Sequence, residues 1–77
     1  MSLSHEPLDP LTPREQEILL LLVRGFSDQE IAQELVLTVS TVKWYNRQIY
    51  SKLGVNKRSM AVVQAHHLGL VDSLSEA

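Results

Sequence analysis

Two basic residues four positions apart, Lys43 and Arg47, have the types and spacing for a specific chemistry. Residues spaced by four lie on one face of an α-helix, so a helix here presents both cations to the same partner. An arginine guanidinium can donate two parallel hydrogen bonds to guanine O6 and N7 in the major groove of DNA, and a lysine ammonium can reach the same atoms. We therefore predict that Lys43 and Arg47 contact bases. The alternative is a pair of ordinary solvated cations.

Trp44 lies next to Lys43 and is predicted to be exposed on the same helix. An exposed tryptophan is costly and uncommon on a small domain. One interpretation is a base contact, in which the ring meets thymine methyl groups or sugar edges. In the other, the ring leans back on the preceding helix or on the chain before it.

A further group of polar residues suits the DNA backbone, whose contacts supply affinity and register rather than sequence preference. Thr38 has a competing structural role as a helix cap. Lys52 has one too, because it could bond the last carbonyl groups of its own helix. The predicted phosphate contacts are Thr38, Ser40, Thr41, Lys52, Lys57, Arg58 and Gln29.

Charge is segregated along the chain, although the net charge is only −2. Residues 1–34 contain seven acidic and two basic side chains, whereas residues 35–71 contain five basic and no acidic ones. A block of like charge usually serves a partner of the opposite sign, and a basic surface on a small helical domain is typical of nucleic-acid binding. Chance segregation on a helical protein is the alternative.

Four helices must position these side chains. Thr12-Pro13-Arg14-Glu15 and Ser27-Asp28-Gln29-Glu30 both predict helix starts with capping boxes, and Thr38 can cap a third helix. Gly25, Gly54 and Gly69 predict helix ends. The expected helices span about 13–24, 28–36, 39–53 and 58–68.

Helical periodicity then assigns the faces of these helices. The predicted inner residues are Ile31, Ala32 and Leu35 in the second helix, Val42, Tyr45, Ile49 and Leu53 in the third, and Ala61, Val62, Ala65 and Leu68 in the fourth. The predicted outer face of the third helix holds Lys43, Trp44, Arg47 and Ser51. The fold class is therefore all-α: a four-helix, bundle-like domain with a central helix-turn-helix. Residues 1–11 are predicted to be a flexible lead-in or linker end, and residues 12–77 to be the domain.

Several motifs resemble a known family. Residues 11–19, LTPREQEIL, resemble the opening of the LuxR/NarL (GerE-like) DNA-binding domain. Other matches fall at the spacings of that family over residues 11–71, and they are Gly25, Ile31, Ala32, Leu35, Thr41-Val42-Lys43, Lys52-Leu53-Gly54-Val55, Arg58, Ala61, Val62, Gly69 and Leu70.

The resemblance implies a transcriptional regulator that binds specific double-stranded DNA sequences through its third helix, with positions 43 and 47 on the bases. It implies a homodimer on DNA, formed through the last helix, with RNA polymerase as a further partner. It also implies the output domain of a response regulator or another signal-responsive protein. A cytoplasmic location is expected and is compatible with the absence of cysteine. This chain contains no receiver or ligand-binding domain.

The sequence departs from the family at three places. Tyr45 stands where a histidine is common, on the flank of the buried face, so it affects packing rather than base reading. Lys57 and Met60 stand where the last helix commonly has a serine or asparagine cap and a glutamate, so its cap is weaker. Trp44 is unusual at an exposed recognition position.

Other classes of function find little support. Seventy-seven residues form one domain with a modest core, which disfavours a large substrate pocket. There is no cysteine, and the acidic residues fall mostly at helix starts, where capping explains them. We expect no enzyme activity and no cofactor. A metal site is disfavoured because His66 and His67 are adjacent and point about 100° apart.

Exposed residues of the last helix form a candidate dimer patch of Val63, His66, His67 and Leu70. The rival to the DNA hypothesis is a protein-interaction module that uses the same basic face on an acidic partner. Salt separates the two, because phosphate binding by four to six cations predicts a log–log slope of roughly −4 to −5.

Overall fold

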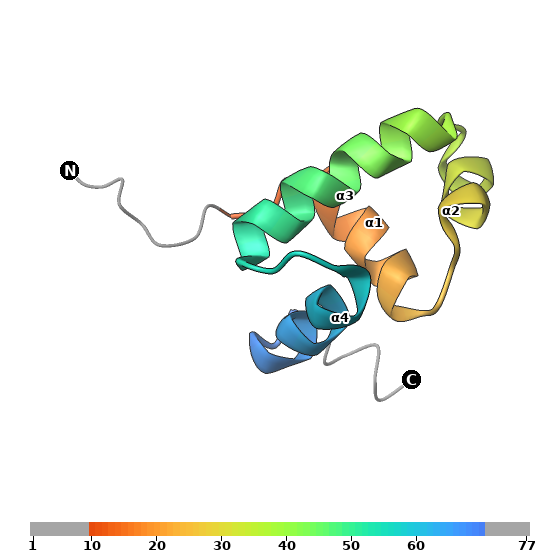
Figure 1. Ribbon diagram of the computed structural model, residues 1–77. Helices are drawn as coiled ribbons and strands as arrows, with labels where there is room; N and C mark the ends of the chain where they lie inside the picture. Colours follow the sequence, from red (N-terminus) through yellow and green to blue (C-terminus); the bar gives the residue numbers. More distant parts are fainter. Residues whose placement is uncertain (1–9, 71–77) are drawn as a thin grey trace.

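A computed structural model describes residues 10–70 of the chain, and helices dominate this part (Figure 1). They are α1 (Pro13–Val23), α2 (Asp28–Leu35), α3 (Val39–Leu53) and α4 (Arg58–His67). Each predicted helix is confirmed, with every end within one residue of its expected position. Most of the predicted lead-in, residues 1–9, lies outside the described residues, so the boundary at residue 12 stays a prediction.

Side chains cap the first three helices as the sequence predicts. Thr12 and Glu15 form a complete capping box on α1, and Ser27 and Glu30 form one on α2. Thr38 Oγ1 accepts a hydrogen bond from the Thr41 amide at the start of α3. Lys57 makes no such side-chain bond to α4, so the predicted weak cap is also confirmed.

Each of the four helices has a residue with positive φ at its C-cap or one residue after it. Three of these are glycines, which adopt this conformation without steric cost. The end of α2 is different, because Val36 has φ 58° and ψ 51° there. A β-branched residue is strained in this left-handed conformation. The strain lies in the turn that joins the two helices of the helix-turn-helix.

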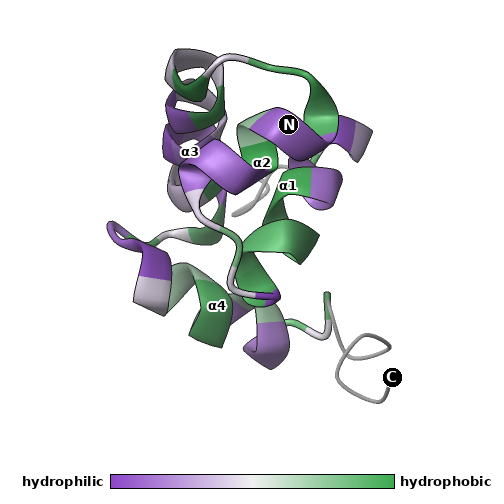
Figure 2. Ribbon diagram, turned by 90° about the vertical axis from the view of Figure 1, so that its right-hand side faces the viewer, coloured by the Kyte–Doolittle hydropathy of each residue, from purple (hydrophilic) through white to green (hydrophobic). Residues whose placement is uncertain are grey.

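The helix α3 packs against each of the other three helices, and α1 also contacts α2 and α4 (Figure 1). The second half of α1 is hydrophobic and lies in the interior (Figure 2). The most deeply buried large side chains are Ile18, Leu19, Ile31, Val42 and Ile49. Burial of such side chains stabilises the fold by about 1.5–3 kcal/mol each.

The predicted inner faces are correct except at Leu68 in α4. In α4, Ala61 and Ala65 are fully buried and Val62 is half-buried, but Leu68 is 43% exposed. Leu68 is the residue that ends the helix, so the helical period no longer directs its side chain inward. In α3, Tyr45 is half-buried and packs against the core as predicted, and the inner face also contains Asn46.

Candidate nucleic-acid interface

The outer face of α3 has the composition that the sequence predicts. Lys43, Arg47 and Ser51 are exposed, and Trp44 is 49% exposed. The Trp44 ring stands edge-on to the ring of Tyr45, with centroids 5.1 Å apart and an interplanar angle of 77°. Tyr45 therefore supports the tryptophan from one side and leaves part of its surface open to a partner.

The start of α3 brings hydroxyl groups and backbone amides together. The Thr38 hydroxyl caps the helix and donates to Thr41 Oγ1 at 3.0 Å, so both threonines are already hydrogen-bonded. Ser40 is exposed between them, and Gln29 is exposed at the start of α2. Unpaired amides at a helix start favour an anion such as phosphate.

The five cations of residues 35–70 fall into two groups. Lys43, Arg47 and Lys57 are exposed and form no ion pair within residues 10–70. Lys52 and Arg58 are each bound inside the domain. The three unpaired cations are therefore the most available for a polyanion.

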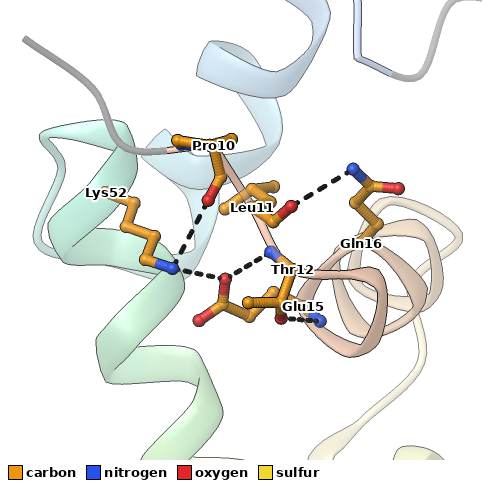
Figure 3. A network of polar contacts seen from close by, with 6 residues as sticks. All are labelled: Pro10, Leu11, Thr12, Glu15, Gln16 and Lys52. Atoms are coloured by element: carbon orange, nitrogen blue, oxygen red, sulfur yellow. Dashed lines mark hydrogen bonds and ion pairs between the residues drawn. The ribbon is translucent and has the colours of Figure 1, made fainter. Parts of the chain in front are cut away.

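Lys52 is held by Glu15 in a polar network that joins α3 to the start of α1 (Figure 3). Lys52 Nζ lies 2.8 Å from Glu15 Oε1 and 3.5 Å from the Pro10 carbonyl oxygen. The Thr12 amide donates to the same Glu15 oxygen at 2.9 Å. The alternative in which Lys52 caps its own helix is wrong, because the ammonium group is directed to α1.

Glu15 closes the capping box of α1 as predicted, yet it is only 4% exposed. Burial alone would raise the pKa of Glu15. Hydrogen bonds from Lys52 and Thr12, with the positive charge of Lys52, outweigh burial and hold this pKa below its ordinary value of 4.5. The carboxylate thus stays charged and fixes one end of α3 on α1.

A second polar cluster, made of Asp28, Asn46 and Arg58, joins three helices on the inner side of α3. Asn46 Nδ2 donates to Asp28 Oδ1 at 3.0 Å. Arg58 Nη2 donates to the Phe26 carbonyl oxygen at 2.8 Å and lies 3.4 Å from Asp28 Oδ1. Burial raises the pKa of Tyr50; of the two nearby charges, Arg58 lowers it and Asp28 raises it.

Sequence reasoning missed this cluster, although one signal was present. On a helical wheel Asn46 lies only about 40° from Val42, well inside the buried face. A polar residue at that position requires a buried partner. Which partner it finds depends on how α2 and α4 pack, and this information is absent from the periodicity of α3.

Apolar and histidine side chains are exposed on α4 and just after it. Val63 is 55% exposed and Leu70 is 45% exposed, while His66 and His67 are also exposed. Met60 adds a further exposed apolar side chain at 46%. The four residues of the candidate dimer patch are therefore all accessible.

Residues 10–70 contain no cluster of three or more histidine, cysteine, aspartate or glutamate side chains that could hold a metal ion. None of the described helices is long and apolar enough to cross a membrane.

Residues 9–65 match the family described as GerE, bacterial regulatory proteins of the luxR family. This match covers most of the chain and includes the helix-turn-helix with its basic outer face. The chain belongs to the GerE (luxR) family. The resemblance seen in the sequence motifs is thereby confirmed. The matched family is one of regulatory proteins rather than enzymes.

Curated relatives of this GerE-family chain are similar over most of its length. It is 46% identical over 66 residues, 86% of the chain, to the transcriptional regulatory protein LiaR of Bacillus subtilis, covering 31% of LiaR. It is equally identical over 66 residues to the response regulator VraR of Staphylococcus aureus, covering 32% of VraR. It is 43% identical over 60 residues, 78% of the chain, to a probable transcriptional regulatory protein, SgaR, of Hyphomicrobium methylovorum, covering 28% of it. The chain thus spans about a third of the length of these relatives.

Two solved structures share the fold. The response regulator ChrA of a heme-sensing two-component system matches with a TM-score of 0.80 and 39% identity, covering 87% of this chain and 33% of that one. VqmA of Vibrio cholera, solved in complex with a ligand and DNA, matches with a TM-score of 0.77 and 31% identity, covering 91% of this chain and 31% of that one. The all-α helix-turn-helix fold class is therefore confirmed.

Proposed function

We propose that this GerE-family domain binds double-stranded DNA in a sequence-specific way and so regulates transcription. The observation that carries the proposal is the outer face of α3, where Lys43, Trp44 and Arg47 are exposed together on the second helix of a helix-turn-helix. In that motif the second helix enters the major groove. Family membership and the likeness to VqmA, which was solved with DNA, support the same function.

The contacts divide by chemistry. Lys43 and Arg47 read base edges, and the open side of the Trp44 ring meets thymine methyl groups or sugars. Lys57 and Ser40 contact phosphate, with Gln29 on the adjoining helix. Thr41 can donate its hydroxyl hydrogen to phosphate, whereas the Thr38 hydroxyl already donates to Thr41 and would have to turn outward to reach phosphate. Lys52 and Arg58 are weaker phosphate donors than the sequence predicts, because each would have to leave or share an internal partner.

The larger protein is the context for this function. The family and the length of the relatives support an output domain of about residues 12–77, controlled by a regulatory domain that precedes it, in a cytoplasmic response regulator or related protein. Two domains pair on DNA through Val63, His66, His67 and Leu70, which are exposed in α4 and after it. RNA polymerase is a further partner of the bound dimer.

Fluorescence anisotropy with a random duplex, and with duplexes selected from a random library, tests the function at two or more salt concentrations. On a random duplex, where no base contact is made and all three available cations can lie near phosphate, the log–log slope is about −3 per domain, whereas five cations would give about −4.5. A preferred duplex, and a slope near −3 on the random duplex, are expected. A folded domain that binds neither duplex at low salt would overturn the proposal and favour an acidic protein partner for the same face.

A further inference from the structure

The inner side of α3 is tied to α2 by a directional bond directly behind the exposed basic face. Asn46, at 7% exposure, donates from Nδ2 to Asp28 Oδ1 over 3.0 Å. Asn46 precedes Arg47 and follows Lys43 by three residues, so it belongs to the turn of α3 that carries both cations. It is too buried to touch DNA itself.

The acceptor of this bond is fixed in its turn. Asp28 is the first residue of α2, directly after the capping residue Ser27. Arg58, at the start of α4, approaches the same Asp28 oxygen at 3.4 Å and is anchored on the Phe26 carbonyl oxygen at 2.8 Å. The position of Asn46 is therefore set by α2 and α4 together.

This arrangement contributes less stability than an apolar side chain could. Asn46 Oδ1 is buried and has no hydrogen-bond partner within residues 10–70. A buried acceptor without a partner is unfavourable, whereas an apolar residue of similar shape avoids that cost. Apolar packing, however, is non-directional and does not fix the rotation of a helix about its axis as a hydrogen bond does.

We propose that Asn46 is a positioning residue for DNA base recognition. Its hydrogen bond to Asp28 fixes the rotation of α3 about the helix axis and thereby the direction in which Lys43 and Arg47 point. The proposal rests on the proposed function of the domain. Side-chain atoms on a helix reach about 5–6 Å from its axis, so a rotation of about 10° moves them by about 1 Å. Functional geometry tolerates only about 0.5 Å, so such a rotation weakens base contacts while leaving phosphate attraction intact.

The first test replaces Asn46 by leucine, which has a similar shape and no polar atoms. For Asn46→Leu we expect a melting temperature at or above that of the wild type. The ratio of the dissociation constants for random and selected duplexes falls by about tenfold, because good base contacts each discriminate by about 1–3 kcal/mol. Affinity for the random duplex changes by less than about twofold. The control is Ile49→Val on the same buried face, which lowers the melting temperature by about 4 °C and leaves the ratio unchanged.

A second pair of variants acts on the acceptor and remains informative if Asn46→Leu does not fold. Asp28→Asn and Asp28→Ala remove the same negative charge from the start of α2, so their effects through the helix dipole are matched. Asp28→Asn keeps an oxygen that can accept from Asn46, whereas Asp28→Ala does not. We expect Asp28→Asn to keep most of the duplex preference and Asp28→Ala to lose it.

The outcomes separate this proposal from the function on which it rests. If the wild-type domain shows no salt-dependent DNA binding, both the proposed function and the positioning role of Asn46 are overturned. A wild-type preference that persists in Asn46→Leu and in Asp28→Ala would overturn the positioning role of Asn46 alone. Loss of preference in both variants, with binding to random DNA retained, is the result that the structure predicts.

Discussion

Neutralising Glu15 should destabilise the domain far more than an ordinary surface substitution would. In Glu15→Gln the side chain keeps an oxygen for the Thr12 amide but loses the charge that lies 2.8 Å from Lys52 Nζ. Removing one partner from a fully buried ion pair costs about 3–5 kcal/mol. Lys52 retains 22% side-chain exposure and can turn toward water, so we expect about 2 kcal/mol.

Thermal unfolding followed by circular dichroism measures this cost. For a domain of this size, 2 kcal/mol corresponds to a fall in melting temperature of about 8–16 °C. A double-mutant cycle with Lys52→Met isolates the ion pair, and we expect the double variant to be more stable than additivity predicts by about 1–2 kcal/mol. The matched control is Glu17→Gln, because Glu17 makes only an exposed ion pair with Arg14 on the same helix. A Glu15→Gln domain within about 0.5 kcal/mol of wild type, or strict additivity with Lys52→Met, would refute this reasoning.

Three further predictions follow from the same contacts. Because the pKa of Glu15 is lowered in the folded state, its contribution to stability is present above pH 4.5 and is lost as pH falls below that value. Wild type should therefore lose more stability between pH 5 and pH 3 than Glu15→Gln does, and equal losses in urea titrations would exclude this role. Val36→Gly should stabilise the domain by about 0.5–1 kcal/mol, because Val36 is 89% exposed and strained at φ 58°, and glycine relieves that strain at some cost in unfolded-chain entropy. The Val36→Ala variant should gain less stability. A Val36→Gly variant less stable than wild type would contradict the strain at this position. Trp44→Ala should weaken binding to a selected duplex by about 1 kcal/mol or more, while the lost ring contact with Tyr45 lowers stability by only about 0.5–1.5 kcal/mol. Identical affinity and sequence preference in anisotropy titrations would mean that Trp44 makes no base contact.

Local sequence signals predicted the helices because each signal acts within one turn. Thr12 with Glu15 and Ser27 with Glu30 form their capping boxes with neighbours three residues away, so the sequence contains both partners. No glycine marks the end of α2 in the sequence, because Val36 adopts there the left-handed conformation that glycine usually adopts. There the packing of α2 against α3 prevails over local preference.

The candidate site was predicted on the outside of α3 and missed on the inside. Lys43, Trp44 and Arg47 follow from helical spacing alone, since an exposed face needs no partner within the domain. The bonds of Lys52 to Glu15 and of Asn46 to Asp28 join residues 37 and 18 positions apart. Such pairs depend on how the helices pack against one another. The hydrophobic periodicity of a single helix does not specify that packing.

The central claim is that the outer face of α3 reads bases, and paired alanine substitutions test it most directly. The measurement is the dissociation constant of wild type, Arg47→Ala and Lys57→Ala for a selected and a random duplex at one salt concentration. The account predicts that Arg47→Ala weakens binding to the selected duplex by about 1–3 kcal/mol and relaxes the preference, while Lys57→Ala weakens both duplexes equally. Equal losses on both duplexes for Arg47→Ala, or an unchanged preference, would contradict base reading by this face.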